Sequence, residues 1–179
     1  MLQIFEKIQG TRTFETLSSL DEIYSHIDSI QSEWKQHSTV NCPDGCGECC
    51  VAFEPDVLEA EALYLAAWLT ENDSEKAKQI MTGDFPMQRK DNKDGCFLFN
   101  PDNPYHCTVY GGRCLICRLF GYSGDRGKDN EIRWKPCRFL PEKKLAAHSP
   151  ALTHRQYEKE ELEHLFGALP PAMSDIMEQ

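Results

Sequence analysis

The sequence predicts an α+β fold that is mostly α, with helices packed around an irregular cysteine-rich core and few short strands. Three observations support this fold class. Apolar residues recur at helical spacing near both ends of the chain. The middle of the chain carries all nine cysteines among Gly, Pro, Asn and Asp turn residues. The apolar runs in that middle part are short, as in brief strands.

The length of 179 residues is typical of one domain with a real hydrophobic core. We expect a single domain, 1–179, made of three segments. Residues 1–38 are an N-terminal helical arm, residues 39–140 a cysteine-cluster core, and residues 141–179 a C-terminal helical arm.

Four helices are expected. Ser19-Leu20-Asp21-Glu22 has the form of a capping box, which predicts a helix from residue 19 to about 34. Pro55 suits the first turn of a second helix that ends near Glu71. Asn72 or Asp73 is expected to cap a third helix over residues 74–81, and Gly167 to end a fourth over residues 153–166.

Residues 91–141 look irregular, and only runs such as 96–99 or 108–110 have strand character. A stretch of this length with so little regular structure is unusual in a compact domain. A bound metal that cross-links the stretch would supply the missing folding free energy.

The segment Cys42-Pro-Asp-Gly-Cys46-Gly-Glu-Cys49-Cys50 gives the most specific chemical indication. Gly and Pro allow sharp turns, so several sulfur atoms can point to one centre. Thiolates select zinc, iron–sulfur clusters or Cu(I) over hard cations. The segment therefore predicts a cysteine-ligated metal protein.

A disulfide framework is the alternative. The odd number of nine cysteines would leave one thiol over, and neighbouring cysteines are strained disulfide partners. The N-terminal residues do not have the pattern of a secretory signal. We therefore expect a cytoplasmic protein with reduced thiols.

The formal net charge of −10 argues against a nucleic-acid partner, which needs clustered Lys and Arg. The apolar runs are too short to span a membrane. The expected partner is a metal ion or cluster, with a protein partner as the alternative.

Two enzymatic interpretations of the cysteines are weak. Cys42, Cys46 and Cys49 have the spacing used by radical S-adenosylmethionine enzymes, but too little chain follows for a barrel. Cys114-Leu115-Ile116-Cys117 has the spacing of a redox pair without a surrounding βαβ pattern. A catalytic base cannot be named, so whether the protein is an enzyme stays open.

The later cysteines make the pattern more specific. Cys96-Phe97-Leu98 precedes His106-Cys107-Thr108-Val109-Tyr110, and Arg113-Cys114-Leu115-Ile116-Cys117-Arg118-Leu119-Phe120 follows. With the first cysteine segment, these residues resemble the CxxCxxCC family of zinc- or iron-chelating domains. The cysteine-rich part of the flagellin lysine methylases, which carry a four-iron cluster, is distantly similar.

The resemblance implies eight metal ligands, of which Cys42 has a shifted spacing and Cys137 comes late: Cys42, Cys46, Cys49, Cys50, Cys96, Cys107, Cys117 and Cys137. Cys114 stands where the family has Pro, so we do not expect it to be a ligand. Neighbouring side chains tend to diverge, so Cys49 and Cys50 are expected to serve different centres, or one of them only to pack. Arg118 and Arg138 are candidates to neutralise thiolate charge.

Eight thiols permit two four-ligand sites, or one site and spare thiols. The resemblance favours an iron–sulfur cluster, [4Fe-4S], slightly over Zn²⁺. A cluster with an open coordination position that modifies a protein or small molecule is one alternative. A structural zinc module that mediates protein–protein interaction is the other.

Overall fold

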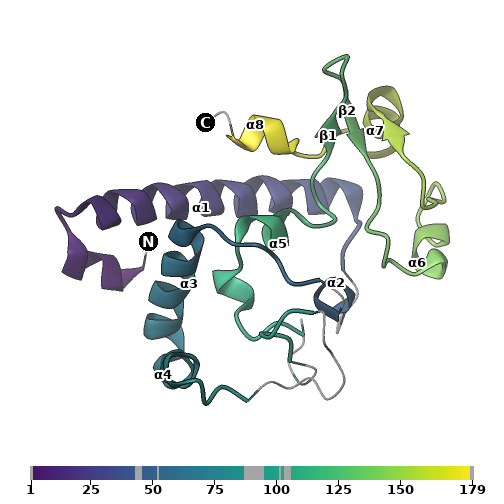
Figure 1. The fold of residues 1–179 in the computed structure, drawn as a ribbon. Helices are drawn as coiled ribbons and strands as arrows, with labels where there is room; N and C mark the ends of the chain where they lie inside the picture. The colour runs from purple at the N-terminus through teal and green to yellow at the C-terminus, as the bar shows by residue number, and fades with distance from the viewer. Residues whose placement is uncertain are drawn as a thin grey trace. The chain divides into compact units, whose positions relative to one another are not determined.

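The computed structural model describes residues 2–42, 46–51, 53–86, 95–100, 102 and 106–177. The chain divides into two compact units. Unit 1 comprises Met1–Ser25 and Asp44–Cys117, and unit 2 comprises His26–Pro43 and Arg118–Gln179. The mostly helical α+β class is confirmed (Figure 1). The single domain of three segments stays a prediction.

The long helix α1 (Arg12–Ser38) supplies residues to both units. It begins before the predicted Ser19, because the Thr11 hydroxyl accepts a hydrogen bond from the Phe14 backbone N–H at 3.1 Å. Ser19 is an ordinary exposed position inside this helix. Apolar residues recur in this helix at helical spacing, and two of them, Ile27 and Trp34, are buried.

Unit 1 contains the 3₁₀ helix η1 (Gln3–Ile8) and the helices α3 (Glu59–Asn72) and α4 (Ser74–Thr82). The Asp73 side chain caps α4 by accepting from the Lys76 N–H at 3.1 Å, as predicted. Gly83 ends α4 in the left-handed conformation, with φ of 77°. The start of α3 was predicted wrongly, since residues 53–58, which include Pro55, are not helical.

The cysteine segments of unit 1 form short elements. These are α2 (Glu48–Val51), the 3₁₀ helix η2 (Tyr110–Gly112) and α5 (Leu115–Leu119), whose last two residues belong to unit 2. The predicted strands reduce to one isolated bridge between Phe99 and Cys107. Trp68 on α3 packs so closely on η2 that a methyl group on Gly112 would lie 2.8 Å from its ring.

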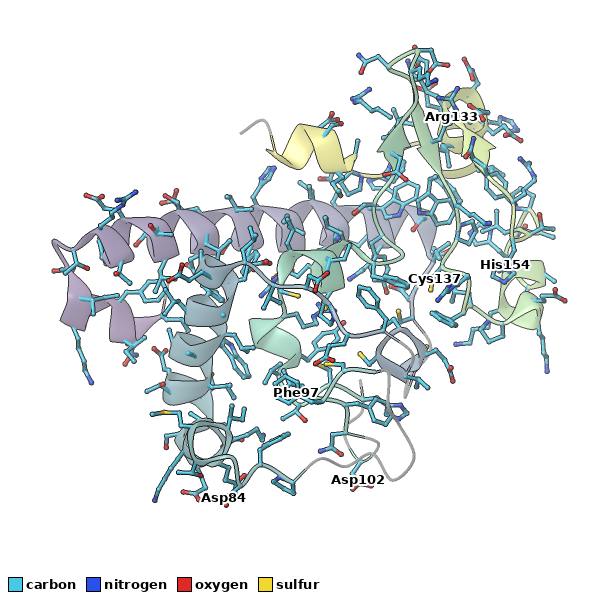
Figure 2. All side chains as sticks on the ribbon, viewed as in Figure 1. Asp84, Phe97, Asp102, Arg133, Cys137 and His154 are labelled. Atoms are coloured by element: carbon cyan, nitrogen blue, oxygen red, sulfur yellow. The ribbon has the colours of Figure 1, made fainter. Side chains whose placement is uncertain are left out.

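Unit 2 holds an antiparallel sheet that the sequence did not predict, with the order β1-β2-β3. Its strands are β1 (Asp125–Arg126), β2 (Ile132–Trp134) and β3 (Tyr157–Glu158). Arg133, labelled in Figure 2, pairs with Asp129 at 2.7 Å and with Glu158 at 2.7 Å. Of the stretch predicted to be irregular, residues 91–94, 101 and 103–105 lie outside the described residues.

The core of unit 2 is built around aromatic rings. The Trp34 ring lies 5.7 Å from that of Trp134 and 5.1 Å from that of Phe166. Phe166 ends α7 (Lys159–Phe166), which begins later than predicted because residues 157–158 form β3. The short helices α6 (Glu142–Ala146) and α8 (Met173–Met177) complete the unit.

His154 of unit 2, labelled in Figure 2, is half-buried, and its Nε2 lies 2.8 Å from the Leu140 carbonyl oxygen. Among the helices in the described part of the chain, none is both long and apolar enough to cross a bilayer.

Candidate metal centre

Cys49 and Cys50 form the first thiol pair of unit 1. Both lie on α2, a single turn in which the Cys50 N–H donates to the Gly47 carbonyl at 2.8 Å. Their Sγ atoms are 3.9 Å apart. The expectation that these neighbouring side chains diverge is therefore wrong, and both sulfur atoms can reach one metal atom.

Cys96 and Cys107 are held next to this turn by backbone contacts. The Cys96 N–H donates to the Cys50 carbonyl at 3.2 Å. Cys107 pairs with Phe99 in the isolated bridge. Phe97, labelled in Figure 2, lies in the turn between Cys96 and Phe99. Gly47 approaches His106 so closely that a methyl group there would lie 2.2 Å from the His106 Cβ. Three separate segments thus meet at the cysteines.

Cys114 and Cys117 form the second thiol pair. Cys117 lies on α5 and Cys114 directly precedes that helix, so their spacing of three residues places both on one face. Their Sγ atoms are 3.4 Å apart. The turn is anchored by Glu61, whose Oε1 accepts from the Leu115 N–H at 2.7 Å.

The two thiols of each pair differ in pKa. The hydrogen bond between Cys49 and Cys50 lowers the pKa of Cys49 to about 7, and the one between Cys114 and Cys117 lowers the pKa of Cys114 to about 7. The same hydrogen bonds raise the pKa of Cys50 and of Cys117. One thiol of each pair is therefore ready to act as a thiolate near neutral pH, and thiolates are the form that binds metals.

Cys96 and Cys107 interact electrostatically with both pairs, since the charges of both thiols raise the pKa of Cys50 and of Cys117. Burial raises the pKa of Cys107 itself, whose side chain is 8% exposed. Six thiols of unit 1 therefore form one interacting group, which we call the thiol cluster: Cys49, Cys50, Cys96, Cys107, Cys114 and Cys117.

Arg113 is the cation of the thiol cluster. Its charge lowers the pKa of both Cys49 and Cys107. The guanidinium stacks over the Tyr110 ring at 3.6 Å, and its Nε donates to the Tyr110 carbonyl at 2.8 Å. Arg118, one of the two cations expected in this role, instead forms an ion pair with Asp28 at 2.6 Å.

Three of the predicted ligands are not among these six thiols. Cys46 belongs to unit 1 and is half-buried. Cys42 and Cys137 belong to unit 2. The Cys42 N–H donates to the Tyr122 hydroxyl at 3.0 Å, and Cys137, labelled in Figure 2, packs against the aromatic core. Whether these three thiols are ligands stays a prediction.

The donor chemistry of the thiol cluster fits zinc or iron. Two thiolates on one tetrahedral Zn²⁺, with Zn–S bonds of about 2.3 Å, lie roughly 3.8 Å apart. The separations of 3.9 and 3.4 Å within the two pairs are close to this value. Among the described residues, no three histidine, cysteine or carboxylate groups surround one point tightly enough to hold an ion. The structure therefore presents the ligands as pairs.

Two residues of this site were missed from the sequence. Cys114 was set aside because of its position in the family pattern, although its i,i+3 relation to Cys117 was visible. The role of Arg113 had no such signal, because Cys49 and Cys107 approach it only in the folded chain.

Comparison with models of protein families shows the family of this chain. The model of the CxxCxxCC family, described as "Putative zinc- or iron-chelating domain", matches residues 41–138, more than half of the chain. The match contains every cysteine of the thiol cluster. Searches of the curated proteins and of the solved structures match nothing, so the similarity to flagellin lysine methylases stays a prediction.

Proposed function

Since the chain belongs to the CxxCxxCC family of zinc- or iron-chelating domains, we propose that its thiol cluster holds a structural metal centre that cross-links unit 1. The observation that carries this proposal is the pair of short Sγ–Sγ separations, 3.9 Å for Cys49–Cys50 and 3.4 Å for Cys114–Cys117. The bound metal would tie α2, the segment around Cys96 and Cys107, and the start of α5 to one centre.

The same separations bear on the identity of the metal. In a four-iron cluster each cysteine ligates its own iron, so no two cysteine sulfur atoms bind the same metal atom. A Zn²⁺ ion, or each iron of a two-iron cluster, takes two or more thiolates on one atom. We propose Zn²⁺ as the metal that the pairs fit best. The [4Fe-4S] cluster implied by the family resemblance is the alternative.

Charge balance supports a closed, structural centre. Four thiolates on Zn²⁺ leave a net charge of −2, and Arg113 is already placed to offset part of it. All nine cysteines are among the described residues, and each is a thiol rather than half of a disulfide. This agrees with a reducing compartment, and we propose the cytoplasm. An enzymatic role, with an open coordination position, stays a prediction.

Anaerobic purification of the full chain, followed by elemental analysis, sulfide determination and an absorption spectrum, tests the proposal. We expect stoichiometric zinc, no inorganic sulfide and no visible absorption. Iron with inorganic sulfide and a brown colour would show that the centre is an iron–sulfur cluster and not zinc, and the proposal of a metal centre would still hold. A chain that is folded to the same extent without any metal would contradict the proposed function.

A further inference from the structure

Cys114 is the one thiol of the cluster that the family pattern does not use, since Pro takes its place there. In this chain its Sγ lies 3.4 Å from that of Cys117, the same kind of approach as the 3.9 Å between Cys49 and Cys50. Each pair can therefore act as a bidentate ligand of one metal atom. We call Cys49–Cys50 the first clamp and Cys114–Cys117 the second clamp.

The second clamp is held in place from both sides within unit 1. Leu115 directly follows Cys114, and its N–H donates a hydrogen bond to Glu61, which is only 8% exposed. Arg113 precedes Cys114 and is fixed by its bond to the Tyr110 carbonyl at 2.8 Å. The residues on both sides of Cys114 are thus anchored within unit 1.

The number of thiols exceeds what one ion takes. A tetrahedral Zn²⁺ binds four thiolates, whereas the thiol cluster has six members. Cys96 lies beside the first clamp, since its N–H donates to the Cys50 carbonyl at 3.2 Å, and Cys107 belongs to the segment bridged to Phe99. These two cysteines are the candidates for the further ligands. In a two-iron cluster, likewise, each iron takes two cysteines.

We propose that Cys114 is a metal ligand and that, with Cys117, it forms the second clamp of a centre containing two metal atoms, one at each clamp. This inference rests on the proposed function and extends it in two respects. It adds a ligand that the family pattern omits, and it fixes the metal content of the chain at two atoms instead of one.

The test compares metal content in the full chain and two variants, purified anaerobically and measured by elemental analysis. We expect two metal atoms in the wild-type chain, about one in Cys114→Ser, and two in Ile116→Ser. Ile116 is a matched control because it lies between the same two cysteines, is 38% exposed and carries no thiol. Substitution with Co²⁺ gives a second readout, since thiolate-to-cobalt absorption should weaken in Cys114→Ser only.

A second measurement uses the wild-type chain alone, so it tests the inference even if Cys114→Ser does not fold. Iodoacetamide labelling of the metal-loaded wild-type chain, mapped by mass spectrometry, should leave Cys114 unmodified until a chelator is added. Labelling of Cys114 before chelation, one metal atom per wild-type chain, or unchanged metal content in Cys114→Ser would each overturn the inference. Those results leave the proposed function standing, which falls only if the wild-type chain binds no metal.

Discussion

Gly47 leaves no space for a side chain. A methyl group at this position would lie 2.2 Å from the Cβ of His106 and 2.7 Å from its Cγ. His106 is itself in the left-handed conformation, with φ of 52°, which a residue with a Cβ adopts at some cost. The two residues thus join the Cys49–Cys50 turn to the segment of Cys107 by direct backbone approach.

We predict that Gly47→Ala destabilises unit 1 by about 1–3 kcal/mol, the usual cost of overpacking, and lowers metal retention. Chemical denaturation and elemental analysis measure the two effects. The double variant Gly47→Ala/His106→Gly should regain part of the loss, because it removes the obstructing Cβ and tolerates the positive φ. Equal stability of Gly47→Ala and the wild-type chain would show that the segments are not in contact.

At the level of single elements, Glu61 connects three parts of unit 1. Its Oε2 accepts from the Leu58 N–H at 2.9 Å at the start of α3, and its Oε1 accepts from the Leu115 N–H at 2.7 Å and from the Tyr24 hydroxyl at 3.0 Å. A buried carboxylate with three donors is well satisfied. Its loss should affect α3 and α5 together.

We predict that Glu61→Gln costs roughly 2 kcal/mol of stability, because an NH₂ group would then face a buried donor. Metal affinity should also fall, since the Leu115 N–H beside Cys114 then has at best a neutral amide oxygen in place of a carboxylate as its acceptor. Thermal denaturation and metal competition measure these effects. Glu59→Gln on the same helix is the matched control, because Glu59 is exposed. A similar cost for both variants would argue against a special role for Glu61.

The start of α7 gives a pH-dependent prediction. Hydrogen bonds from Arg155, and a further one from the Glu158 N–H, lower the pKa of Glu161 from 4.5 to about 2. Because the pKa is lowered on folding, the stabilisation is fully present above pH 4.5 and is lost as the pH falls through 2. Salt should weaken the effect at this exposed site.

We therefore expect Glu161 to titrate near pH 2 by NMR in the folded chain. In Arg155→Ala the pKa of Glu161 should move up toward its ordinary value, and the acid sensitivity of α7 should start at higher pH. An unchanged Glu161 titration in Arg155→Ala would mean that this ion pair does not exist in solution.

Local signals predicted some elements and missed others. Asp73 was one of the two predicted caps of α4, because a capping side chain acts on the N–H groups two or three residues away. The beginning of α1 was missed because Ser19 and Thr11 offer similar caps and only the folded helix decides between them. The sheet was missed because β3 is two residues long and pairs with β2 across a long connection.

The site follows the same division. The cysteine spacing predicted metal binding, since the chemistry of thiolates is independent of the fold. The clamp at Cys114 and the role of Arg113 depend on how α3, η2 and α5 pack, which spacing alone does not determine.

On the scale of the whole chain, the thiol cluster and the larger aromatic core belong to different units. The core of unit 2 contains Trp34, Trp134, Tyr157 and Phe166, none of which is a metal ligand candidate. In the described part of unit 1 the cysteine segments themselves form only short elements. Loss of the metal should therefore affect the two units unequally.

We predict that chelation lowers hydrogen-exchange protection in residues 46–51, 95–100 and 106–117, while the amides of β2 and α7 stay protected. Residues 118–141, the later part of the stretch that a metal was expected to cross-link, belong to unit 2 and include two strands. Hydrogen exchange with mass spectrometry, with and without chelator, is the measurement. Equal loss in both units would show that the metal stabilises the whole chain.

The contact between Trp68 and η2 has an optical consequence. Of the three tryptophans in the chain, Trp34 and Trp134 lie in the core of unit 2, whereas Trp68 lies against Gly111 and Gly112, just before the second clamp. With the other two tryptophans replaced by Phe, Trp68 would be the single tryptophan of the chain, next to the thiols. Its emission would then report the arrival and departure of metal in real time, without any added dye.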